Sequence, residues 1–257
     1  ARTITTNTLW GAMASPIFLP LMAWLVLEFD WRTALRLSGV AVAVVVALVA
    51  LAVPDIRGVG SAPTSLMAAI IAAGRDRATR AVLATTFLGG VATAIVILYQ
   101  VPVMVTAGLT LAVASSLAGA RGFMQLGGRI PMPRLVDRFG SRTTLRGAHL
   151  LTGVSCLVLP FAGVFPVAVV FAVVAGLAIG ALVPVESIFT ADIIPTESLG
   201  VVLGVTSLAR GIGSALGPVL GGVLASAVGG RTPTLVVAAG LTVIAAVLVP
   251  VAQQRES

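Results

Sequence analysis

Long apolar runs separated by short polar connections make up almost the whole chain. The hydrocarbon core of a bilayer is about 30 Å thick, and a helix needs about 20 apolar residues to cross it. Windows of this kind cover residues 8–28, 33–53, 81–105, 109–131, 146–163, 166–191, 199–227 and 233–252. Because these runs are continuous and not alternating, they predict membrane-spanning helices and not the strands of a large barrel. The pattern therefore predicts an all-α integral membrane protein with eight spans.

The connection from Pro54 to Arg80 is the only long one between the predicted spans. Its segment Thr64 to Ala73 is apolar enough to form a short helix at the membrane interface. A plain linker with an apolar patch explains the same residues equally well. Both interpretations stay open from the sequence.

Composition narrows the class of protein further. The chain is 58% hydrophobic and only 10% charged, whereas soluble domains contain about 25% charged residues. The net charge of +7 comes from arginines in a few connections, and only 5% of the residues are aromatic, so nucleic-acid binding is not expected. The single Cys156 and the single His149 provide neither a disulfide framework nor a metal cluster. We expect no cofactor.

The arginines predict the orientation of the spans. An inner side made of the N-terminus, the connections 54–80, 129–146 and 192–198 and the C-terminus would hold Arg2, Arg57, Arg75, Arg77, Arg80, Arg129, Arg134, Arg138, Arg142, Arg146 and Arg255. The outer side would hold Arg32, Arg36 and Arg231. Eleven arginines against three place the first side in the cytoplasm, because short cytoplasmic connections carry the excess of positive charge. We expect a multi-pass protein of the plasma (inner) membrane with a cytoplasmic C-terminus.

An internal repeat indicates how the spans are grouped. The segment Gly213 to Gly222 reads GSALGPVLGG, with glycine, glycine-proline and glycine-glycine at fixed spacing, and Gly11 to Pro20 has a degraded form of it 202 residues earlier. The repeat is therefore about 200 residues long and contains six helices. We expect residues 1–53 to be the last two helices of a first half, 54–80 a cytoplasmic central loop, and 81–257 a complete second half. Four further helices of the same chain would then precede Ala1, and the complete chain would have twelve helices.

The loop from Leu135 to Arg142 resembles the Gly-x-Leu-Ala-Asp-Arg-x-Gly-Arg-Arg signature of the major facilitator superfamily, with Pro133 in place of the first glycine. Asp30-Trp31-Arg32 and residues 191–204 resemble two other parts of that family. The resemblance implies a bundle of twelve helices and a loop that locks the inner gate. It assigns that gating loop to Leu135, Asp137, Arg138, Gly140 and Arg142. The family's antiporter motif, which belongs on helix five, has its full form here on the expected helix eleven, so an antiporter is not implied.

Three ionisable residues within predicted spans are candidates for a transport pathway, because such residues are costly in a bilayer. The candidate residues are Arg121 with Gln125 on one helix face, Arg210 with Thr206 on another, and Glu186. One interpretation is a polar cavity of net charge +1, which suits an anionic substrate and uses Glu186 as a proton carrier. The alternative is that Glu186 forms a structural or gating bridge with one arginine, while the other binds a backbone carbonyl.

The glycines of the repeat predict close packing between two helices. Small residues at this spacing form one helix face and let a neighbouring backbone approach. We expect this role, and not ligand contact, for Gly213, Gly217, Pro218, Gly221 and Gly222.

These features together favour transport over catalysis. The chain has no Ser/His/Asp grouping, no phosphate-binding Gly-x-x-x-x-Gly-Lys segment and no lysine at all, so neither an enzyme nor an ATP-driven pump is expected. The prediction is a secondary transporter for a small organic solute, with a proton as the coupling ion because Glu186 can take up and release one. Residues 191–204 favour efflux, and Arg121 and Arg210 favour an organic anion. The alternative function is a non-transporting membrane remnant or a membrane protein that binds a partner.

Overall fold

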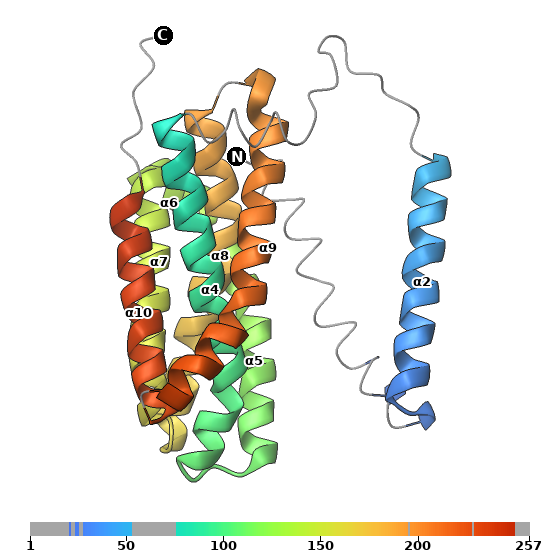
Figure 1. Ribbon diagram of the computed structural model, residues 1–257, viewed down its shortest axis with the longest axis vertical. Coiled ribbons are helices and arrows are strands. Elements are labelled where there is room, and N and C mark those ends of the chain that lie inside the picture. Colours follow the sequence, from blue (N-terminus) through green and yellow to red (C-terminus); the bar gives the residue numbers. More distant parts are fainter. Residues whose placement is uncertain are drawn as a thin grey trace. The chain divides into compact units, whose positions relative to one another are not determined.

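A computed structural model describes residues 21, 24–25, 28–52, 76–194, 196–227 and 229–249. Within these residues every regular element is a helix, which confirms the predicted all-α class. The chain divides into two units, one within residues 13–65 and one that contains all described residues from 76 onward (Figure 1). The predicted span 8–28 falls mostly outside the described residues, and so does the segment 64–73.

Helix α2 (Trp31–Ala52) is the long helix of the first unit. The carboxylate of Asp30 accepts a hydrogen bond from the backbone N–H of Thr33 at 2.9 Å, which satisfies one of the free donors at the start of the helix. Most of its 22 residues are apolar and almost all are exposed, as expected for a segment that crosses a bilayer. The predicted span 33–53 is therefore helical up to Ala52, the last described residue of this unit.

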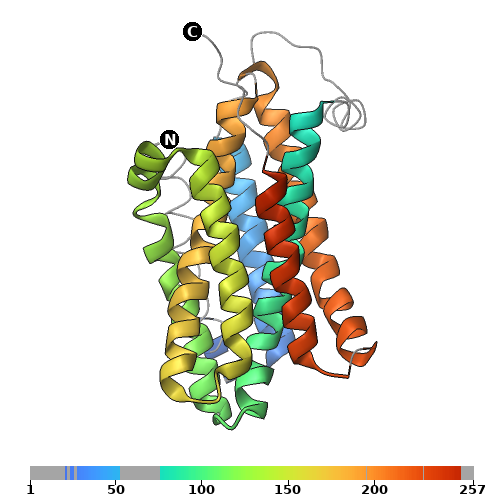
Figure 2. The same cartoon turned by 90° about the vertical axis from the view of Figure 1, so that its left-hand side faces the viewer.

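The second unit is a bundle of long helices with one short helix and one 3₁₀ turn. In chain order these elements are α4 (Arg77–Thr106), α5 (Leu111–Arg129), α6 (Met132–Phe139), α7 (Ser141–Val158), η1 (Leu159–Phe161), α8 (Phe165–Ile193), α9 (Thr196–Ala227) and α10 (Arg231–Leu248). The long helices run alternately in opposite directions (Figures 1 and 2). Helix α4 packs against α9 and α10, α5 against α8, and α7 against α8 and α10.

Six helices of the described chain are long and apolar enough to cross a membrane, and α5 is not among them. Helix α5 nevertheless covers the predicted span 109–131 and packs along α8. The polar side chains of Arg121 and Gln125 and the guanidinium of Arg129 lower its apolar character. Helix α5 is therefore shielded partly by its neighbours, which explains how a less apolar segment lies in the bundle.

The boundary of the predicted span 146–163 is wrong by one helical turn, because α7 already begins at Ser141. The arginine side chains explain the difference. Arg146 lies within the helix and donates from Nε to the carbonyl of Ala246 at 3.0 Å and from Nη2 to that of Val249 at 3.4 Å. These bonds satisfy carbonyls at the end of α10, so an arginine here does not require a loop.

The predicted inner loop 129–146 contains the short helix α6, which packs against α7 and α8. Buried Met132 belongs to a core cluster with Leu145, Leu182 and Phe189. Gly140 links α6 to α7 with a φ of 78°, a conformation that glycine adopts without strain.

Arginines gather at one end of the bundle. This end contains the start of α4, the connection from α5 to α7 and the end of α10 (Figures 1 and 2). The arginines at this end are Arg77, Arg80, Arg129, Arg134, Arg138, Arg142 and Arg146. At the opposite end, the described bundle residues include Arg231.

At the arginine-rich end, the Thr79 hydroxyl and N–H donate to Asp76 and hold the pKa of this carboxyl below its usual value, which fixes the start of α4.

Glycines bring α4 and α9 into close contact. A Cβ at Gly213 would clash with the carbonyl oxygen of Phe87, and one at Gly217 would lie 2.7 Å from the Cβ of Ala94. One at Gly221 would lie 2.9 Å from the Tyr99 ring. Pro218 is half-buried, while a Cβ at Gly222 would meet nothing within 4 Å.

We expect Gly217→Ala to destabilise the bundle, because the added methyl group would force α4 and α9 apart. Overpacking of this kind costs about 1–3 kcal/mol. Gly240→Ala on α10 is the matched control, since no atom lies within 4 Å of its Cβ position. Thermal unfolding of the purified protein in detergent, followed by circular dichroism, measures both. Equal stability of the two variants would contradict close packing at Gly217.

Candidate functional site

A buried ion pair joins α8 to α9 near the middle of the bundle. Glu186 on α8 is only 7% exposed, and its Oε2 forms a salt bridge with Nη2 of Arg210 on α9. The Arg210 side chain is partly exposed, at 22%. Glu186 is thus paired with one arginine, which is the contact described by the bridge interpretation of the sequence.

The position of Arg210 depends on the close approach of α9 to α4. A Cβ at Gly90 of α4 would lie 2.8 Å from the backbone oxygen of Arg210. Only a glycine at position 90 leaves room for the α9 backbone at this level. Thr206, one turn earlier on α9, is buried and donates its hydroxyl to the carbonyl of Leu203 at 2.9 Å.

His149 on α7 is the third ionisable member of this cluster. Its side chain is completely buried, and its Nε2 lies 3.7 Å from Oε1 of Glu186. No partner for His149 could be predicted from the sequence, because only the packing of α7 against α8 brings His149 and Glu186 together. The one feature of the sequence that could have marked His149 as functional is its position, as the single histidine of the chain, within an apolar run.

Arg121 lies at another depth and has another partner. Its Nε donates to Oε1 of Gln100 on α4 at 2.8 Å, while its Nη1 is buried without a hydrogen-bond partner. The guanidinium thus binds a side chain of another helix, and Gln125, the neighbour suggested by helical spacing, is only half-buried. Gln100 lies eleven residues after Gly89 on α4, which corresponds to about 16 Å along the helix axis. The two arginines therefore do not line one compact site.

The gating-loop residues lie at the arginine-rich end of the bundle. Asp137 and Arg138 are exposed on α6, Leu135 and Arg142 are half-buried, and Gly140 forms the turn. Within the described part of the chain, the ion pairs are those of Glu186, and Asp137 has none.

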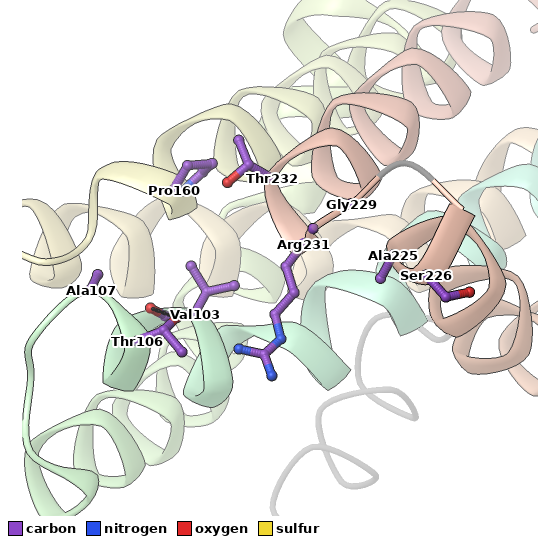
Figure 3. Close-up of a pocket in the computed structure, with 10 residues that line it drawn as sticks. Val103, Thr106, Ala107, Pro160, Ala225, Ser226, Gly229, Arg231 and Thr232 are labelled. Carbon is purple, nitrogen blue, oxygen red and sulfur yellow. Dashed lines mark hydrogen bonds between the residues drawn. The ribbon is translucent and has the colours of Figure 1, made fainter.

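Open space in the bundle lies far from the ion pair. A pocket of about 700 Å³ is found at the end opposite the arginine-rich one, between α4, η1 and the α9–α10 connection. Figure 3 shows the Arg231 side chain extending across it toward Val103 and Thr106. Beside Glu186, by contrast, the space lined by Thr85, Thr86 and Phe189 has no room for a water molecule.

Comparison with known proteins identifies the family. The model of the major facilitator superfamily matches residues 81–256. The chain belongs to this superfamily. The match confirms the resemblance seen in the sequence, and a superfamily member with this set of apolar helices is a multi-pass membrane protein. The comparison with curated proteins finds no match.

Solved structures of the superfamily have the same fold. The crystal structure of the E. coli fucose:proton symporter FucP (N162A) is 17% identical, with a TM-score of 0.63 over 87% of this chain and 54% of that chain. A structure of FucP in the outward conformation is 18% identical, with a TM-score of 0.64 over 86% of this chain and 56% of the other. The chain thus spans a little over half the length of these structures.

We expect Glu186→Gln and Arg210→Gln each to destabilise the bundle, since each leaves one buried charge without its partner. Losses of this kind are about 3–5 kcal/mol. The double variant should lose less than either single variant, because it buries no charge. Denaturant unfolding in lipid–detergent micelles measures the cycle, and additive losses would show that the pair does not interact.

Proposed function

We propose that the chain is part of a proton-coupled secondary transporter that moves a small organic anion across the plasma membrane. The observation that carries the proposal is the charge balance of the bundle interior. Two arginines lie at mid-helix positions, Arg121 and Arg210, whereas the described interior of the bundle holds one buried acid, Glu186, which pairs with Arg210. The interior of the described bundle therefore has one positive charge that a substrate anion would balance.

Glu186 is the proposed site of proton coupling. A carboxylate buried among membrane helices exchanges its charge for a proton more readily than it stays unpaired. Protonation removes the negative charge and with it the attraction for Arg210. The reported fold relative from E. coli is a fucose:proton symporter, which supports a proton as the coupling ion.

Arg121 is the proposed contact for the anionic group of the substrate. Its Nη1 is buried and has no hydrogen-bond partner, while Gln100 holds the Nε side of the same guanidinium. An arginine fixed on one edge presents its free edge for a carboxylate or a similar planar group. In the same proposal, Leu135, Asp137, Arg138, Gly140 and Arg142 form the inner gate, and the two helix halves rock about the site.

We expect Arg121→Gln and Arg210→Gln each to abolish transport. Proteoliposomes with an imposed proton gradient would be tested with radiolabelled gluconate, citrate, methanesulfonate and benzenesulfonate, which do not cross bilayers on their own. Arg134→Gln removes the same type of charge from an exposed position on α6 and should leave the rate unchanged. If the unaltered protein moves none of the anions but moves neutral or cationic solutes, the anion proposal is wrong. If it moves no solute at all, the non-transporting alternative holds.

The proposal also places the arginine-rich end of the bundle in the cytoplasm, since positive charge collects there in short connections. In a Cys156→Ala background, Ala107→Cys marks one end of the bundle and Thr143→Cys the other, both at exposed positions. A membrane-impermeant maleimide should label Ala107→Cys on intact cells and Thr143→Cys only after lysis. The reverse pattern would invert the proposed orientation.

A further inference from the structure

His149 is a buried ionisable residue that the proposed transport cycle does not yet use. It lies on α7, is 0% exposed and has no hydrogen-bond partner on either Nδ1 or Nε2. A histidine that serves only packing normally has its ring nitrogens satisfied, because an unmade buried hydrogen bond is costly. Two unpartnered nitrogens therefore call for a functional explanation.

The acceptor nearest to the imidazole is the unused oxygen of Glu186. Nε2 of His149 lies 3.7 Å from Oε1 of Glu186, and this oxygen is buried without a hydrogen-bond partner, whereas Oε2 binds Arg210. A shift of less than about 1 Å would bring Nε2 and Oε1 to hydrogen-bond distance. One carboxylate thus lies between a permanent cation and a group that can become a cation.

Gly89 on α4 makes room for this arrangement. A Cβ at position 89 would lie 2.7 Å from Cε1 of His149 and 3.9 Å from Oε1 of Glu186. Any larger residue would displace the ring from the carboxylate. The absence of a side chain on α4 therefore permits α7 and α8 to bring the two groups together.

We propose that His149 binds the transported proton and, as imidazolium, competes with Arg210 for Glu186. The proposal rests on the proton-coupled transport proposed above and extends it, because the proton that offsets the charge of Glu186 is then held by His149 in a hydrogen bond to Oε1 of Glu186. The imidazole takes up one proton, and the resulting N–H donates to Oε1. The carboxylate then has two cationic partners, which weakens its hold on Arg210 and frees that guanidinium for the substrate anion. Loss of the proton restores the original pair, so one proton accompanies one anion.

The groups around His149 support competition between these three residues alone. Among the described residues, α8 contributes Glu186 and α9 contributes Arg210, while α4 faces the cluster with Gly89 and the neutral Thr86. On α7 itself, Arg146 is one turn away and donates to carbonyls at the end of α10. No other described acid competes for the proton.

The direct test is nuclear magnetic resonance of the ¹⁵N-histidine-labelled protein in lipid nanodiscs between pH 4 and pH 9, with no substrate added. His149→Gln assigns the signal, because this chain has a single histidine. At a fixed pH, Arg210→Gln should increase the imidazolium fraction of His149 by removing the competing cation. Glu186→Gln should decrease it, since the imidazolium then has no carboxylate and still faces Arg210.

Opposite changes in the two variants support the proposal, and a His149 signal that stays neutral and identical in all three proteins overturns it.

Transport provides a second readout. In the proteoliposome assay, His149→Gln should lose proton-driven accumulation yet keep exchange of the anion that the unaltered protein moves. Cys156→Ala, a buried change two turns along α7, should affect neither. Failure of this inference leaves transport intact without a role for His149, whereas failure of the proposed function leaves no anion transport in any variant.

Discussion

A charge buried between apolar helices must be neutralised nearby, and this constraint governs the middle of the bundle. Glu186 is 7% exposed and has its counter-charge, Arg210, on the next helix in the chain. A buried ion pair seldom stabilises a protein more than well-packed apolar residues would, since desolvation offsets the attraction. Stability alone does not account for the pair, and the proposed function assigns it a change of charge during transport.

The ion pair depends in turn on how closely the helices approach each other. Gly90 lets the α9 backbone at Arg210 contact α4, and Gly213 and Gly217 keep α9 in contact with α4 beyond that point. On the other side of the cluster, Gly89 leaves space for the His149 ring. Glycines on α4 and α9 thus set the distances between three ionisable groups, His149, Glu186 and Arg210, which lie on three different helices.

The helices could be predicted from the sequence because bilayer thickness fixes the length of an apolar run. Their ends could not, as α7 shows: Arg146 is polar in sequence, yet its side chain reaches the carbonyls of α10 and the helix continues around it. The hydrogen-bond and ion-pair partners of buried polar groups could not be predicted from the sequence either. Spacing along one helix placed Gln125 on the same face as Arg121, whereas the hydrogen-bond partner of Arg121 is Gln100, 21 residues away on the neighbouring helix. The same holds for His149, whose contact with Glu186 arises only from helix packing.

Access of solvent to the described bundle differs along its length, because a pocket opens at one end while the space beside Glu186 is closed. Val103 lines the pocket of about 700 Å³ and lies one turn after Gln100, the hydrogen-bond partner of Arg121, on the same face of α4. About 16 Å further along α4, at Gly89, the space next to Glu186 admits no water. A group entering from the pocket end would meet Arg121 before it reached the ion pair. In the proposed transport cycle, passage beyond that point would require Glu186 and Arg210 to separate, which would link neutralisation of Glu186 to movement of the solute.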